Sequence, residues 1–353
     1  MDKSVVFAVA GSGKTTSIVE RLNLEKRFLI VTYTDNNLAN LKRKIIGKFG
    51  FFPATITLIT YFTFLHSFCF KPFLVMKMGT KGINYDQPPA WTQKLKRTNS
   101  NYYINGHQRL YHNRIAKLLE VTETISEIKK RIEKYFDALF IDEVQDFGGQ
   151  DFNFLTALCD SNVDLFFVGD FYQHTYVTSQ DGNTNINLHK DYDKYKKRFI
   201  DAGLTVDTTS LAKSYRCSQS VCDFIRQHIG IEIYSHHSLV TDAKFMKDQA
   251  DADRLHACNA TVKLFYEEHH KFGCLSNNWG NSKGADHYQD VCIVLNGTAE
   301  KALSKGKMSE ANPQTRNKLY VACSRARGNL FLLPGLTFKK YKAHGNPPII
   351  NCS

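Results

Sequence analysis

The stretch AVAGSGKTT at residues 8–16 combines two glycines with a lysine and two threonines. Glycine at positions 11 and 13 allows the backbone to turn so that its N–H groups point at phosphate oxygens. In that arrangement Lys14 reaches the terminal phosphates and the Thr15 hydroxyl is a ligand for Mg²⁺. We therefore predict a phosphate-binding loop, with nucleotide contacts from Ala10, Gly11, Ser12, Gly13, Lys14, Thr15 and Thr16.

An acidic pair follows the apolar run DALFIDE at residues 137–143. A phosphate-binding loop needs a second anchor for its metal at the end of a neighbouring strand, and Asp142 fits that place. Glu143 is the candidate general base that polarises an attacking water. An apolar run that ends in Asp-Glu is common by itself, but its pairing with the glycine loop favours phosphoryl-transfer chemistry.

The elements that must position these residues alternate between strands and helices. Apolar runs at 4–10, 27–34, 137–143 and 163–170 are typical of buried strands, and helical patterns follow the first two. This alternation predicts an α/β fold with parallel sheets covered on both faces. We expect a first NTP-binding core over residues 1–65 and 135–202, a mostly helical insertion over 66–134, and a second core over 203–353.

Composition limits the function classes. The chain of 353 residues carries a net charge of +12, which permits a polyanionic partner such as nucleic acid. No apolar stretch is long enough to span a membrane, and the first residues lack the pattern of a signal peptide. Nine scattered cysteines without a Cys-x-x-Cys pair fit free thiols, so we expect a cytoplasmic protein without a membrane partner.

The motifs that follow resemble those of one family in the same order. With its Asp-Glu-x-Gln-Asp sequence at 142–146, the chain resembles the UvrD/Rep-type branch of superfamily 1 helicases and translocases. The other segments that resemble this branch are residues 31–36, 60–62, 168–173, 215–218, 282–286 and 321–327. The resemblance spans residues 8–327 and implies two RecA-like P-loop cores.

For the nucleotide, the resemblance implies that Gln173 senses the γ-phosphate and that Arg216 and Arg325 are arginine fingers. Tyr215 is expected to stack on the base, and Gly284 and Asp286 to contribute to nucleotide binding. Because both arginines of the family come from the second core, ATP is expected to bridge a cleft that hydrolysis opens. The implied cofactors are ATP, with other NTPs or dNTPs as alternatives, and Mg²⁺.

For DNA, the resemblance implies contacts from Thr32, Tyr33, Thr60, Phe62, Tyr176, Ser282 and Lys283. The aromatic members, Tyr33, Phe62 and Tyr176, could each stack on a base, and packing in the core is the alternative for each. The basic clusters at 42–44 and 94–97 either contact backbone phosphates or form solvated helix faces.

The sequence also departs from this branch. Only seven residues precede Ala8, so the glutamine segment that reads adenine is expected to be missing, and Thr16 replaces the arginine that flanks the base. Base discrimination is therefore expected to be weak. Too few residues separate Arg216 from Lys283 for the large insertion of the second core, and Gly280 stands where relatives often have a histidine.

Three hypotheses follow from the sequence. The first is a Mg²⁺-dependent, DNA-stimulated NTPase that acts as a single-stranded DNA translocase or as a helicase, with movement in the 3′ to 5′ direction. The second is a DNA-activated NTPase that senses DNA, including DNA ends, or nucleotides and regulates a partner effector such as a nuclease, for example in anti-phage defence. The third is a DNA-binding scaffold with an inert nucleotide site, against which the intact motif residues argue. RNA is an alternative to DNA in each hypothesis.

Overall fold

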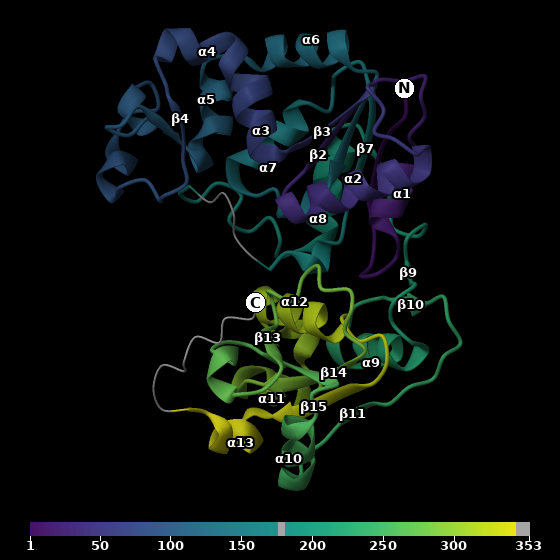
Figure 1. The fold of residues 1–353 in the computed structure, drawn as a ribbon. Coiled ribbons are helices and arrows are strands. Elements are labelled where there is room, and N and C mark those ends of the chain that lie inside the picture. The colour runs from purple at the N-terminus through teal and green to yellow at the C-terminus, as the bar shows by residue number, and fades with distance from the viewer. Residues whose placement is uncertain (176–180, 344–353) are drawn as a thin grey trace. The chain divides into compact units, whose positions relative to one another are not determined.

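The computed structural model describes residues 1–175 and 181–343, and the chain forms two compact units (Figure 1). Unit 1 contains Met1–Phe7, Lys14–Phe171 and Val177–Thr209. Unit 2 contains Ala8–Gly13, Tyr172–Tyr176 and Ser210–Ser353. The glycine loop thus belongs by its contacts to unit 2, although the strand before it and the helix after it belong to unit 1.

Unit 1 is built on a six-stranded parallel sheet with the order β3-β2-β6-β7-β1-β8. The strands are β1 (Lys3–Phe7), β2 (Phe28–Thr32), β3 (Ile56–Thr60), β6 (Ala138–Asp142), β7 (Asp164–Gly169) and β8 (Thr205–Asp207). Every residue of β2 and β6 is buried, as expected for central strands covered on both faces. Because the strands are parallel, the residues that follow them meet at one edge of the sheet.

Helices α1 (Lys14–Glu20), α2 (Asp35–Phe49), α7 (Gly149–Ala157) and α8 (Tyr192–Asp201) accompany this sheet (Figure 1). The Thr34 hydroxyl caps α2 by accepting from the Asn37 N–H, and Gly50 ends the helix with φ +80°. The helical pattern after the glycine loop, TTSIVERLNLEKR at residues 15–27, predicts a longer helix than α1, which ends at Glu20. Lys48 Nζ donates to the carbonyls of Val19, Glu20 and Leu22, and it thereby replaces further helical bonds at the end of α1.

The insertion between β3 and β6 is mostly helical. It contains α3 (Tyr61–Thr63), a π-helical segment (Phe64–Phe70), α4 (Lys71–Met78), α5 (Ile115–Val121) and α6 (Ile125–Tyr135), with short 3₁₀ turns (Figure 1). The sequence pattern did not predict its two short parallel strands, β4 (Gly82–Asn84) and β5 (Arg109–Tyr111). With three residues each, these strands are too short for a periodicity signal.

A buried ion pair joins this insertion to the segment before α8. The guanidinium of Arg114 is fully buried and donates to both carboxylate oxygens of Asp181 at 3.1 Å. Tyr102, Gln93 and Arg97 also donate to this carboxylate. Because so many donors surround one carboxylate, the desolvation of both charges is offset by hydrogen bonds.

Unit 2 is built on a five-stranded parallel sheet with the order β11-β15-β14-β12-β13. Its strands are β11 (Ala243–Phe245), β12 (Thr261–Phe265), β13 (Ser276–Asn278), β14 (Asp290–Leu295) and β15 (Leu330–Pro334). Along β14, Val291, Ile293 and Leu295 pack against α9 (Gln219–Ile229), α11 (Gly297–Ser304) and α12 (Pro313–Cys323). The alternate residues pack with α10 (Gln249–Ala257) and α13 (Gly335–Phe338) on the other face.

The α/β class with parallel sheets is confirmed. In the second half, the apolar runs DVCIVL (290–295) and GNLFLLP (328–334) also predict strands, and they form β14 and β15. The pattern did not predict β11, β12 or β13. Two of these are edge strands of three residues, and β12 contains a buried lysine, Lys263, that interrupts the apolar pattern. Among the helices that the structure describes, none is long and apolar enough to cross a membrane.

We expect Asp181→Ala to lower the free energy of unfolding of unit 1 by about 3–5 kcal/mol, because it leaves the Arg114 charge buried without its counter-ion. Urea unfolding followed by Trp91 fluorescence, in a Trp279→Phe background, measures this change. Trp91 is a suitable reporter because the hydroxyl of its neighbour Thr92 accepts from Arg114.

Asp201→Ala is the control, since it removes the carboxylate of an exposed pair with Lys197. This control is expected to change stability little. Equal effects of the two substitutions would contradict a structural role for the buried pair.

Candidate functional site

The glycine loop leaves β1 and packs into unit 2. Val9 and Ala10 lie in the hydrophobic core of that unit. The Ala10 N–H donates to the Tyr320 hydroxyl at 2.8 Å, and the Val9 N–H donates to the Leu211 carbonyl at 3.0 Å. Gly11 and Gly13 have φ values of +71° and +91°, in the left-handed region where glycine is favoured.

The loop also contacts the Ser214–Arg216 segment. The Tyr215 N–H donates to the Gly11 carbonyl at 2.9 Å. A Cβ atom at Gly11 would lie 2.7 Å from Arg216 Cβ and 2.8 Å from Ser214 Oγ. No side chain fits in that space, so the glycine permits the loop to approach Arg216 closely. The sequence-predicted loop and one of the predicted arginines are therefore adjacent within unit 2.

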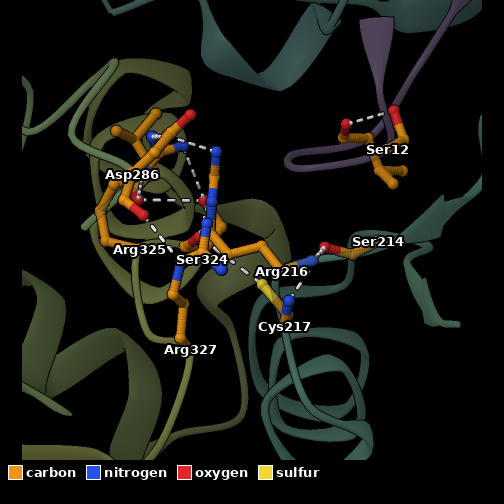
Figure 2. A network of polar contacts seen from close by, with 10 residues as sticks. Ser12, Ser214, Arg216, Cys217, Asp286, Ser324, Arg325 and Arg327 are labelled. Atoms are coloured by element: carbon orange, nitrogen blue, oxygen red, sulfur yellow. Dashed lines mark hydrogen bonds and ion pairs between the residues drawn. The ribbon is translucent and has the colours of Figure 1, made fainter. Parts of the chain in front are cut away.

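Two arginines of unit 2 share one carboxylate (Figure 2). Arg216 forms an ion pair with Asp286, and Arg325 Nη1 lies 3.4 Å from the same Oδ1 atom. Arg216 also donates to the Ser324 carbonyl at 3.2 Å, and Arg325 to the Val321 carbonyl at 3.1 Å. Burial, together with the nearby Arg216 charge, lowers the pKa of Arg325 to about 10.

Both guanidinium groups thus face an anionic group in this structure. Arg325 is 1% exposed, so an anion beside it interacts through a medium of low dielectric constant. Arg327, which donates to the Asp286 backbone carbonyl at 2.7 Å, holds that residue in place (Figure 2). The arrangement can bind an anionic group such as a phosphate.

In unit 1, the acidic pair lies where β6 ends. The Asp142 carboxylate is buried, and it accepts from the Glu143 N–H at 3.0 Å and from the Thr32 hydroxyl at 3.4 Å. Glu143 has φ +56°, a conformation that costs free energy in a residue with a side chain. Strain of this kind is often found at functional positions.

Gln145 orients the side chain of Glu143. Its amide nitrogen donates to the Glu143 carboxylate, and its Oε1 accepts from the Asp170 N–H at 3.0 Å. A Cβ atom at Gly169 would overlap Gln145 Oε1 at 2.2 Å, so β7 must end in glycine for this contact to form. Gln145 therefore connects the ends of β6 and β7.

The residues present fit a hard divalent cation. The Asp142 carboxylate and the Thr15 hydroxyl are oxygen ligands, which Mg²⁺ prefers. Lys44 donates to the Thr16 hydroxyl at 2.8 Å, so Thr16 is engaged by a side chain of α2. Lys14 is the first residue of α1 and follows Gly13 directly in the chain.

The remaining residues that were predicted to bind nucleotide lie in unit 2. Gln173 is buried at the end of a short 3₁₀ turn, Phe171–Gln173, and Gly284 has φ +86°. The Tyr215 ring is 57% exposed and stacks on His236, with ring centroids 3.7 Å apart. The Ser12 hydroxyl donates to the Val9 carbonyl at 2.8 Å, so it stabilises the loop itself.

The sequence-predicted DNA contacts fall into two groups. Tyr33 and Phe62 are half-buried, with rings 5.9 Å apart, so each packs partly against the core and keeps some exposed surface. Thr32 and Ser282 are fully buried; Thr32 bonds Asp142, and Ser282 bonds the Trp279 carbonyl. Thr60 caps α3, Lys283 is half-buried, and Tyr176 lies outside the described residues.

Sequence reasoning assigned no role to Gln145, Ser214 or Tyr320. Gln145 lies inside the Asp-Glu-x-Gln-Asp motif, so its sequence position carried a signal. Ser214 Oγ accepts from the N–H groups of Arg216 and Cys217, at 3.2 and 3.1 Å. Ser214 and Tyr320 contact the loop only because the fold brings them there, and no local pattern marks them.

We expect Gly11→Ala to destabilise unit 2 by about 2–4 kcal/mol, because it combines a left-handed conformation with a collision at Arg216 and Ser214. Urea unfolding followed by the fluorescence of Trp279, which is buried in unit 2, measures the loss.

Gly273→Ala is the matched control. It has φ +58° but no atom within 4 Å of its added Cβ, so it reports conformational strain alone. Equal losses in the two variants would show that the contact with Arg216 contributes nothing.

Two solved structures illustrate the likeness of the chain to known folds. The structure of PRRSV helicase has a TM-score of 0.47 and 15% identity, over 98% of this chain and 56% of that one. An Arterivirus nonstructural protein 10 (helicase) in complex with DNA has a TM-score of 0.49 and 13% identity, over 94% and 60%. The present chain thus spans less than two thirds of either structure. No curated protein matches the sequence.

A protein-family match covers the part of the chain that carries the loop and the acidic pair. Residues 2–179 match the family described as AAA domain. This segment is half of the chain, and it contains Gly11, Lys14, Asp142, Glu143 and Gln173. The chain belongs to the AAA domain family.

Proposed function

We propose that the protein is a Mg²⁺-dependent nucleoside triphosphatase of the UvrD/Rep type whose turnover is stimulated by single-stranded DNA. The observation that carries the proposal is the contact between the glycine loop and Arg216. Phosphates held by a loop of this sequence would lie beside a guanidinium group that only a glycine at position 11 allows to come so close.

The charges of unit 2 support a role in phosphoryl transfer. Arg216 and Arg325 share the Asp286 carboxylate in this structure. A γ-phosphate carries more negative charge than one carboxylate, so it competes with Asp286 for both guanidinium groups. Arginines that stabilise the charge developing on a transferring phosphoryl group typically contribute several orders of magnitude to the rate.

The acidic pair of unit 1 supports the hydrolytic step. When bound, Mg²⁺ neutralises phosphate charge, with Thr15 and Asp142 as its proposed protein ligands. Glu143 is the proposed general base, which accepts a proton from the attacking water. Gln145 restricts the Glu143 carboxylate to one orientation, and Lys14 binds the terminal phosphates.

The positive charge of the chain and the partly exposed rings of Tyr33 and Phe62 support single-stranded DNA as the activator. We propose that hydrolysis drives movement along the strand in the 3′ to 5′ direction. Regulation of a partner effector is the competing outcome. Hydrolysis that DNA stimulates, without translocation or strand displacement on duplexes with 3′ or 5′ tails, would favour that outcome.

We expect Glu143→Gln to lower the turnover number about 10²–10⁴-fold, because an amide cannot accept the proton of the attacking water. Nucleotide binding is expected to persist, since the loop and Lys14 are unchanged. Phosphate release and binding of a fluorescent ATP analogue measure the two properties.

Glu120→Gln applies the same chemical change to an exposed glutamate that pairs with Lys117, and it should leave both properties unchanged. Turnover that survives in Glu143→Gln would refute the general-base role.

We expect Gln145→Leu to lower kcat about tenfold with little change in KM, because the Glu143 carboxylate loses its orientation while the phosphate contacts remain. Steady-state kinetics measures the split between kcat and KM. Gln150→Leu is the control, as Gln150 is also a buried glutamine with a side-chain partner, Thr184 at 2.9 Å. A rise in KM with unchanged kcat would contradict the positioning role.

A further inference from the structure

A series of aromatic rings runs from the core of unit 1 onto the insertion. The Tyr33 and Phe62 rings lie 5.9 Å apart, and the Phe62 and Tyr85 rings lie 5.4 Å apart at an angle of 89°. Tyr85 in turn stacks on His112 at 5.8 Å, with the ring planes 27° apart. We call Tyr33, Phe62, Tyr85 and His112 the aromatic path.

The two short strands of the insertion position the outer end of this path. Tyr85 follows β4 and His112 follows β5, and these parallel strands pair Asn84 with Tyr111 at their last residues. His112 Nδ1 lies 3.3 Å from the Asn84 carbonyl, which fixes the histidine ring beside the end of β4. The path is therefore held by backbone pairing as well as by ring contacts.

The exposed fraction of the Tyr85 side chain distinguishes it from tyrosines that pack in the core. Its side chain is 62% exposed, whereas Tyr61 and Tyr102, which pack in the same unit, are 1% and 0% exposed. Because the ring stacks on His112 and meets the Phe62 ring at 89°, it is oriented while much of its surface stays accessible. An oriented, accessible ring suits stacking with a planar ligand.

The charge of the insertion identifies the class of ligand. Residues 66–134 contain 13 basic and five acidic residues, so this fifth of the chain carries +8 of the total net charge of +12. Arg109 is exposed on β5, where it pairs with Gly82 of β4. An exposed aromatic ring on a positively charged insertion fits a polyanion with unpaired bases, and an apolar protein segment or a lipid surface does not need both features.

We propose that Tyr85 stacks on an unpaired base of single-stranded nucleic acid, and that the strand continues from Tyr33 and Phe62 onto the insertion. The proposal rests on the proposed function, since it extends the path of the activating strand. It adds a stacking residue from the insertion, and it assigns exposed basic residues of the insertion, such as Arg109, to the phosphates of that strand.

The test is the affinity of the protein for a fluorescent oligo-dT, measured by anisotropy without nucleotide. Tyr85→Ala is expected to weaken binding about tenfold, and Tyr85→Phe to bind like the parent, because both rings stack. Circular dichroism checks that each variant is folded. Parent-like affinity in a folded Tyr85→Ala protein overturns the proposal.

Tyr135→Ala is the matched control. Tyr135 is an exposed tyrosine at the end of α6, 43% exposed, and Figure 1 shows α6 well separated from β4. We expect this variant to keep the parental affinity for oligo-dT. A tenfold loss in Tyr135→Ala would overturn the assignment to the aromatic path.

The salt dependence of the affinity for oligo-dT distinguishes base stacking from charge contacts with phosphates. The slope of log affinity against log salt concentration is expected to stay the same in Tyr85→Ala and to fall by about 0.7 in Arg109→Ala. Duplex DNA of equal length should compete poorly, and competition as strong as that of oligo-dT overturns base stacking. Oligo-U in place of oligo-dT distinguishes RNA from DNA as the source of the bases.

The stacking proposal and the proposed function are tested by different measurements, so that one can fail without the other. Absent NTP hydrolysis refutes the proposed function, whereas the anisotropy measurement needs no hydrolysis. Tight oligo-dT binding that depends on Tyr85 would then still support the stacking assignment.

Discussion

The structure depends most on one close packing contact, between the backbone of Gly11 and the Ser214–Arg216 segment. The loop that carries Gly11 connects β1 to α1 and belongs to unit 2 by its contacts. Its middle is fixed by unit 2, through Tyr320, Leu211 and the Tyr215 N–H. Packing of this kind tolerates little change in volume, which makes the loop a rigid part of the molecule.

The charges of Arg216, Arg325 and Asp286 place a second constraint on the structure of unit 2. Two guanidinium groups, one of them fully buried, are held close together by a single carboxylate that is more than half exposed. The Asp286 carboxylate offsets the repulsion between the two guanidinium groups in this structure. Because the Asp286 side chain is accessible, a ligand with more negative charge can reach the arginines without unfolding their surroundings. The cluster is thus preorganised for an anionic ligand.

The sequence allowed the strands that carry Asp142 and the glycine loop to be predicted, because each is a continuous apolar run followed by polar residues. The parallel sheet then brings their carboxyl ends to one edge, and the acidic pair is found there. Contacts across long sequence distances could not be predicted in this way. The hydrogen bond from the Ala10 N–H to the Tyr320 hydroxyl joins residues 310 positions apart, and no local sequence pattern predicts it. The end of α1 depends on Lys48, a residue of another helix.

The ion pair of Arg114 with Asp181 has a consequence for the folding of the chain during its synthesis on the ribosome. Its two charges are 67 positions apart, and every residue of the insertion is synthesised before Asp181. Until that carboxylate emerges, Arg114 has no counter-ion and must stay in contact with water. The insertion therefore reaches its final packing only after β6 and β7 have been made, and during this interval it depends on the solvent, or on chaperones, for protection against aggregation.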